Sequence, residues 1–155
     1  MRNGMLIAVA VVVLSGAGVV AAAEGWLTDF ELAKKVALEK KIPILVDFSG
    51  SDWCGWCKKL DREVFSQDAF KKYAKDGLVL FLADFPSMKE QSEKEKTQNK
   101  GLAEKYGIEG FPTVLIVSAD GKELARTGYQ PGGADAYVEH IKSLLKAAEE
   151  KNTKK

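Results

Sequence analysis

The chain of 155 residues contains two cysteines, Cys54 and Cys57, with only Gly55 and Trp56 between them. A disulfide joining them would restrain the unfolded chain very little, because loop-closure entropy grows with the length of the closed loop. Small exported domains that depend on disulfides for stability usually carry several of them. A purely structural role is therefore disfavoured, and the spacing indicates a redox-active disulfide.

The residues around the pair predict that a strand ends before it and a helix begins at it. Cys54 would then lie at the helix N-terminus, with Cys57 one turn later on the same side. Unpaired backbone N–H groups and the helix dipole would stabilise a thiolate on Cys54 and lower its pKa, aided modestly by Lys58 and Lys59. Cys57 would be placed to attack a mixed disulfide formed on Cys54. The chemistry that this arrangement predicts is dithiol–disulfide exchange.

Two other uses of the cysteines fit less well. A structural zinc site usually needs four ligands, whereas the pair offers two, and the single histidine, His140, falls in the last predicted helix. A cysteine protease needs a base beside its thiol, and a second thiol is the wrong partner. We therefore expect neither a metal ion nor a cofactor.

The remaining sequence predicts alternating helices and strands. Thr28 begins a capping box for the first helix, and Ser66 could cap the third. The order indicates an α/β fold with a hairpin at one side of its sheet. The predicted elements are helix 28–40, strand 42–48, helix 58–65, helix 67–75, strand 78–83, a solvated helix or loop over 86–101, helix 102–106, strands 113–117 and 123–127, and a last helix with an apolar stripe over 137–148.

The N-terminus has the pattern of a secretory signal peptide. Arg2 precedes an apolar stretch over 5–20, and small residues follow up to Ala23. We predict a signal peptide over 1–23 that is cleaved after Ala23, a domain over 24–150, and a flexible tail over 151–155. The alternative is an uncleaved membrane anchor, which Ser15, Gly16 and Gly18 disfavour. This places the protein in the periplasm or another extracytoplasmic compartment.

The charge of the predicted mature chain disfavours polyanionic partners. From Glu24 onward the chain has 22 basic and 22 acidic residues. A neutral balance does not favour binding to nucleic acid or to an anionic membrane surface. A length near 130 residues fits one domain with one core, which we expect to be a monomer.

Three separated motifs resemble the thioredoxin superfamily and follow one another in that family's order. They are Leu45-Val46-Asp47-Phe48, Trp53-Cys54-Gly55-Trp56-Cys57-Lys58, and Tyr106-Gly107-Ile108-Glu109-Gly110-Phe111-Pro112-Thr113 with Gly128. The segment 57–66 resembles exported thioredoxin-like proteins and the C-terminal thioredoxin domain of periplasmic thiol:disulfide interchange proteins. The resemblance implies a thioredoxin-like fold whose central mixed sheet of about four strands is flanked by helices.

The resemblance also implies roles for individual residues. Cys54 would be the nucleophile and Cys57 the resolving thiol. A cis Phe111-Pro112 bond would face the pair, and the neighbouring backbone would pair with an extended substrate. The substrate-binding residues implied in this way, together with the two aromatic residues that could shield the thiols, are Trp53, Gly55, Trp56, Phe111 and Pro112.

Asp47 is a carboxylic acid within an otherwise apolar strand, so burial is expected to raise its pKa. The resemblance implies that such an acid assists proton transfer at the resolving cysteine, which adds Asp47 to the candidate catalytic residues. Asp47 lies seven residues before Cys54, one more than in the usual thioredoxin spacing, and Leu80 stands where thioredoxin has a buried lysine. An acid at the strand end that reaches water remains the alternative.

The sequence thus predicts an exported thiol:disulfide oxidoreductase that acts on protein disulfides as a reductase or isomerase. A membrane redox partner would recharge it. The Gly55-Trp56 pair departs from the Gly-Pro of cytosolic thioredoxin, so an oxidase that donates its disulfide is one alternative. The other is a thioredoxin-fold binding or chaperone module whose cysteines are incidental.

Overall fold

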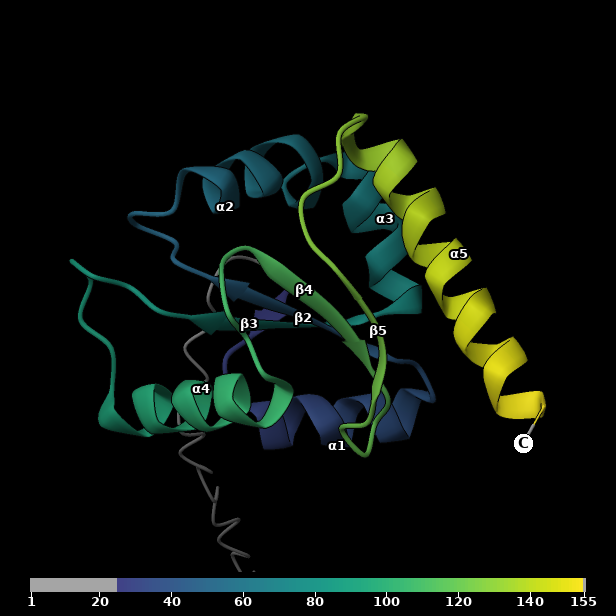
Figure 1. Cartoon of the computed structure of the whole chain (residues 1–155), viewed down its shortest axis with the longest axis horizontal. Coiled ribbons are helices and arrows are strands. Elements are labelled where there is room, and N and C mark those ends of the chain that lie inside the picture. The colour runs from purple at the N-terminus through teal and green to yellow at the C-terminus, as the bar shows by residue number, and fades with distance from the viewer. Residues whose placement is uncertain (1–24, 155) are drawn as a thin grey trace, which may run out of the picture.

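A computed structural model describes residues 25–154, in which five strands form one mixed sheet (Figure 1). The strand order is β1-β3-β2-β4-β5; β1, β3 and β2 run parallel, while β4 is antiparallel to both β2 and β5. The strands are β1 Trp26–Leu27, β2 Ile44–Ser49, β3 Val79–Asp84, β4 Thr113–Val117 and β5 Glu123–Thr127. The helices are α1 Phe30–Lys40, α2 Gly55–Leu60, α3 Asp68–Gly77, α4 Glu93–Tyr106 and α5 Gly133–Thr153, with a π-helical turn η1 over Asp61–Phe65.

Helices cover both faces of the sheet. α1 and α4 lie on one face, and α2, α3 and α5 lie on the other (Figure 1). Side chains of β2 alternate between the faces, so Val46 packs toward α1 and α4 whereas Leu45 packs toward α3 and α5. Burial of each such side chain contributes about 1.5–3 kcal/mol. Because β2 is buried on both faces, it reads as an almost continuous apolar run, and Asp47 falls on the same face as Leu45.

The structure confirms the predicted α/β fold and both strands of the predicted hairpin. It adds β1 at the sheet edge, where Trp26 pairs with Leu80; two residues are too short for a periodic pattern to predict. The cap of α1 is Asp29, whose carboxylate accepts from the Leu32 N–H at 3.1 Å, rather than Thr28. Ser66 does not cap α3 either, because its hydroxyl donates to Asp61 at 3.1 Å.

Two other predicted boundaries differ from the structure. The charged segment before Gly101 and the predicted short helix after it form one helix, α4, that begins at Glu93 and is anchored by buried Leu102 and Tyr106. α5 continues to Thr153, so the expected domain boundary at residue 150 falls inside this helix. The predicted signal peptide over 1–23 lies outside the described residues. No helix within residues 25–154 is long and apolar enough to cross a membrane.

Candidate active site

The two cysteines are joined in a disulfide where the chain passes from β2 into α2. The Sγ atoms are 2.15 Å apart and the Cα atoms 5.3 Å apart. Cys54 is the N-cap of α2, as predicted, with an extended backbone, and its Sγ accepts a hydrogen bond from the Cys57 N–H at 3.2 Å. Cys57 lies in the first turn and is 4% exposed. The sulfur of Cys54 is thus held against the amides of the helix start, where a thiolate would be stabilised.

A cis peptide bond between Phe111 and Pro112 lies in the loop before β4, as the resemblance implied. The Phe111 ring lies edge-on to the Trp53 ring, with 5.9 Å between centroids, so this loop lies beside the cysteine loop. Gly128 leaves room for it: a Cβ on Gly128 would meet the Pro112 carbonyl oxygen at 3.1 Å. The ring contact with Trp53 and the close approach of Gly128 together fix where the cis-proline loop lies.

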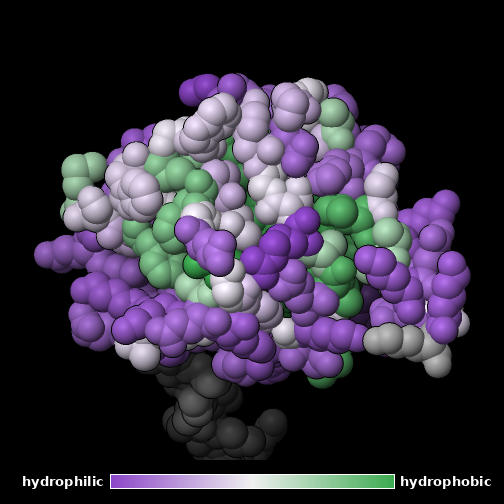
Figure 2. Space-filling model, in the orientation of Figure 1, coloured by the Kyte–Doolittle hydropathy of each residue, from purple (hydrophilic) through white to green (hydrophobic). Residues whose placement is uncertain are grey.

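We call the first aromatic surface beside the disulfide the Trp53 platform; it consists of Trp53, Phe85 and Phe111. Trp53 is 50% exposed, and its indole N–H donates to the Phe85 carbonyl oxygen at 2.8 Å. The Phe85 and Phe111 rings are 5.1 Å apart. Figure 2 shows pale and green surface on this side of the molecule, bordered by the purple surface of α4. The platform offers apolar contact area with fixed ring positions.

The second aromatic surface, the Trp56 platform, consists of Trp56, Tyr129 and Lys59. The two rings are 5.2 Å apart, and the Lys59 Nζ atom lies 5.0 Å from each ring centroid. The Tyr129 hydroxyl donates a hydrogen bond to Glu63 at 2.6 Å. This hydrogen bond is the main reason that the pKa of the Glu63 carboxyl is lowered. The platform therefore combines apolar area with a cation held over aromatic faces.

Asp47 is buried within β2, with 7% of its surface exposed. Its Oδ1 atom has no hydrogen-bond partner among the described residues. Burial raises the pKa of Asp47 to about 8, and the negative charges of Asp61 and Asp84 add to that rise. This burial disagrees with the alternative of a strand-end acid exposed to water. With its pKa near neutral pH, the carboxyl group can give a proton in its neutral form and take one in its ionised form.

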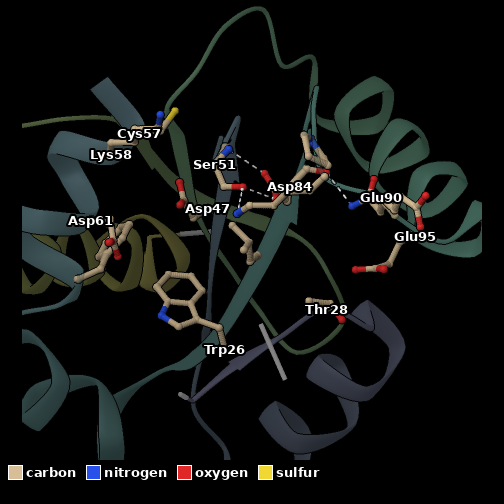
Figure 3. A pocket seen from close by; sticks show the side chains of 16 residues that line it. Trp26, Thr28, Asp47, Ser51, Cys57, Lys58, Asp61, Asp84, Glu90 and Glu95 are labelled. Carbon is tan, nitrogen blue, oxygen red and sulfur yellow. Dashed lines mark hydrogen bonds between the residues drawn. The ribbon is translucent and has the colours of Figure 1, made fainter. Parts of the chain in front are cut away.

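Asp47 and Cys57 line the same cavity, which has a volume of about 570 Å³ (Figure 3). Ser51, Asp61 and Asp84 also border it. A polar cavity of this size can hold water. The cavity therefore brings Asp47 and Cys57 to one space that polar side chains border.

The sheet places apolar side chains of β3 beside Asp47 and its neighbours. The register pairs Asp47 with Leu82, while Leu80, which the resemblance sets at the place of a buried lysine, pairs with Leu45. Both side chains are apolar, so nothing in β3 offsets the cost of a charge on Asp47.

Several site residues were not found from the sequence. Phe85 and Tyr129 complete the two platforms. Their positions in the sequence could have indicated them, since Tyr129 follows Gly128 of the resemblance and Phe85 follows β3 directly.

His140 lies in α5, outside the cysteine loop, and forms a hydrogen bond with Thr127 at 2.9 Å. No cluster of three or more His, Cys, Asp or Glu side chains suited to a metal ion occurs over residues 25–154.

Comparisons with known proteins identify the family of this chain and several relatives. Residues 30–142 match the family model of the thioredoxin-like domain. The chain is 41% identical over 104 residues to disulfide bond reductase DsbH of Chlamydia pneumoniae, covering 67% of this chain and 63% of that protein. It is 30% identical over 130 residues to thioredoxin-related protein DsbJ of the same organism, covering 79% of this chain and 37% of that protein. The chain thus spans less than two thirds of each of these relatives.

A solved structure titled DsbH Oxidoreductase superimposes with a TM-score of 0.71 at 38% identity. The match covers 74% of this chain and 79% of that one.

Proposed function

The chain belongs to the thioredoxin-like domain family, and from that premise we propose that it is a thiol:disulfide oxidoreductase that reduces protein disulfides. The observation that carries the proposal is the Cys54–Cys57 disulfide at the start of α2, beside a cis proline and between two exposed aromatic platforms. The name of the 41% identical relative, a disulfide bond reductase, supports the direction.

In the proposed reaction, Cys54 is the nucleophile. Its thiolate attacks one sulfur of a substrate disulfide; that bond breaks, a Cys54–substrate bond forms, and the other substrate sulfur leaves as a thiolate and takes up a proton. Cys57 then loses its proton and attacks the Cys54 Sγ, which releases the second substrate sulfur and forms the Cys54–Cys57 disulfide. Two electrons pass from the dithiol to the substrate.

The enzyme returns to its reduced form by the reverse chemistry with a dithiol donor. The donor thiolate attacks Cys54, and Cys57 leaves as a thiolate. Asp47, protonated near pH 7 and lining the same cavity as Cys57, supplies the proton that this thiolate needs and takes it back in the resolving step. The second thiolate of the donor then attacks the donor sulfur bonded to Cys54 and releases the Cys54 thiolate, so the donor ends as a disulfide and electrons balance over the cycle.

The platforms and the cis-proline loop bind the substrate in this proposal. Trp53 and Phe111 contact apolar side chains on one side of the substrate cysteine and Trp56 on the other, while backbone next to Pro112 pairs with the extended substrate chain. Gly55, between the cysteines, leaves open space for that chain, since a Cβ there would meet nothing within 4 Å among the described residues.

We further propose that residues 1–23 are a signal peptide, that the domain beginning at Glu24 acts outside the cytoplasm as a monomer, and that its dithiol donor is a membrane protein. The pattern of residues 1–23 supports the export, and the alternative of a retained anchor is tested by the N-terminal sequence of the protein recovered from cells. A new N-terminus at Glu24 is expected.

The function is tested by two measurements on the chain that begins at Glu24. Reduction of insulin by dithiothreitol should be accelerated, and the reduction potential of the pair against glutathione should lie near −270 mV, as for a reductase. A potential near −120 mV would instead indicate an oxidase. Failure to exchange with any disulfide would favour a binding module.

A further inference from the structure

Asp52, two residues before the outer cysteine, binds a run of consecutive backbone N–H groups. Its Oδ1 atom accepts from Ser87 at 2.9 Å, and its Oδ2 atom accepts from Met88 at 2.7 Å and from Lys89 at 2.9 Å. Successive N–H groups that converge on one carboxylate form an anion-binding nest. These bonds lower the pKa of the Asp52 carboxyl, with the Ser87 bond the largest cause, so the carboxylate is ionised at neutral pH.

The residues on either side of Asp52 bond to the same segment. The Ser51 hydroxyl donates to Asp84 at 2.6 Å, and the Trp53 indole N–H donates to Phe85 at 2.8 Å. Three consecutive residues of the cysteine loop are therefore fastened to the segment 84–89 that follows β3. The Asp52 carbonyl oxygen also accepts from the Lys58 ammonium at 2.8 Å, which ties this loop to the first turns of α2.

The Trp53 ring packs within this fastened region. The ring covers Gly50 so closely that a Cβ there would meet the indole at 2.4 Å. Its other contacts are Phe85, which belongs to the fastened segment, and Phe111, which precedes the cis proline. The segment 86–89 has only exposed or half-buried residues, so packing alone does not hold it in place. Asp52 is the residue with the most hydrogen bonds to it.

We propose that Asp52 is a positioning residue that fixes the Trp53 platform for protein substrates carrying apolar side chains next to their disulfide. The inference rests on the proposed function. Asp52 does not touch the reacting sulfurs in this account; it acts through the segment 85–89 and the indole. Small disulfides that lack a flanking chain do not need the platform, so their exchange does not depend on Asp52.

The test compares Asp52→Asn and Asp52→Ala with wild type and two controls. Asn keeps the shape but can accept with only one of its two terminal atoms, so at least one of the three bonds is lost. Asp52→Glu keeps the carboxylate and tests rescue. Asp76→Ala removes an exposed acid of α3 and is the matched control. Each variant is assayed with insulin and, separately, with oxidised glutathione.

We expect the KM for insulin to rise about three- to tenfold in Asp52→Asn and Asp52→Ala, with kcat and the rate with oxidised glutathione within about twofold of wild type. The indole N–H of Trp53 should exchange with solvent faster in both variants by NMR, Asp52→Glu should restore part of both effects, and Asp76→Ala should match wild type. An unchanged KM for insulin, or an equal loss with both substrates, would overturn the inference. A wild-type protein inactive on insulin would instead contradict the proposed function.

Discussion

The backbone N–H of Cys57 donates a hydrogen bond to the Sγ atom of Cys54 over 3.2 Å, while the same two residues share a disulfide. In the reduced protein we expect this N–H to face a thiol or a thiolate on Cys54. Because the donor stabilises the anion far more than the neutral thiol, the local helix geometry favours the nucleophilic form. The two-residue spacing between the cysteines thus places a hydrogen-bond donor at the Cys54 sulfur, which should raise its reactivity.

Cys54 is expected to ionise more readily than a free cysteine. In a reduced Cys57→Ala variant, the rate of alkylation by iodoacetamide should follow a titration with a midpoint clearly below about 8.5, the ordinary pKa of a cysteine thiol. The alkylation rate as a function of pH gives this midpoint directly. A midpoint at or above the ordinary value would show that the helix start does not activate the sulfur.

Asp47 should make the protein less stable as the pH rises. Its pKa is raised from 3.8 to about 8 in the folded state, so between these values the folded chain keeps a proton that the unfolded chain releases. The stability penalty is therefore absent below about pH 4, grows as the pH rises from 4 to 8, and reaches its full size above pH 8.

Replacing Asp47→Leu removes this penalty and should increase the free energy of unfolding at pH 8 by roughly 2–5 kcal/mol relative to wild type. Urea denaturation at pH 5 and pH 8 measures the change, with exposed Asp76→Leu as the control for a general loss of charge. A gain that does not depend on pH would contradict the raised pKa.

Asp47 should also control the rate at which the disulfide is reduced. In Asp47→Asn the Cys57 thiolate loses its proton donor, so reduction by dithiothreitol at pH 7 should slow by roughly 10- to 100-fold. Stopped-flow tryptophan fluorescence follows the reaction across pH. Wild type should show a change of slope near pH 8 that the variant lacks, and identical profiles would rule out a role for Asp47 in proton transfer.

Much of the fold could be predicted because local patterns agree with tertiary structure. The buried run of β2 and the cysteine spacing gave the strand and the helix start that meet at the disulfide. The sequence could not decide which of two neighbouring residues caps the first helix. Thr28 and Asp29 can both cap a helix, and the backbone at Asp29 decides between them.

Contacts between distant residues could not be predicted from local patterns. That Leu82 lies beside Asp47 depends on sheet register, which is set by pairing between strands. Gly101 did not end a helix, since one glycine costs only about 1 kcal/mol and the buried anchors of α4 outweigh it. The bonds from Asp52 to residues 35 to 37 positions away have no periodic signature.

Gly50 and Gly101 form a matched pair for testing how the Trp53 ring is seated. Gly50→Ala places a Cβ where the ring lies and should displace it, lowering stability by about 1–2 kcal/mol and shifting tryptophan emission. Gly101→Ala has open space among the described residues and should raise stability by about 0.5–1 kcal/mol. Thermal unfolding and fluorescence report both, and an unaltered emission spectrum in Gly50→Ala would mean that the ring is not held against Gly50.

The different roles of the two sulfurs are tested most directly by trapping mixed disulfides with substrate proteins. With Cys57→Ala, Cys54 should capture protein substrates in the extracytoplasmic compartment as mixed disulfides that resist release and disappear on treatment with dithiothreitol. Cys54→Ala should capture far fewer, because Cys57 lies within the first turn of α2 and its sulfur does not receive the backbone hydrogen bond that the Cys54 Sγ atom accepts. Equal trapping by both variants, or no adducts with either, would contradict the account of an outer nucleophile released by an inner thiol.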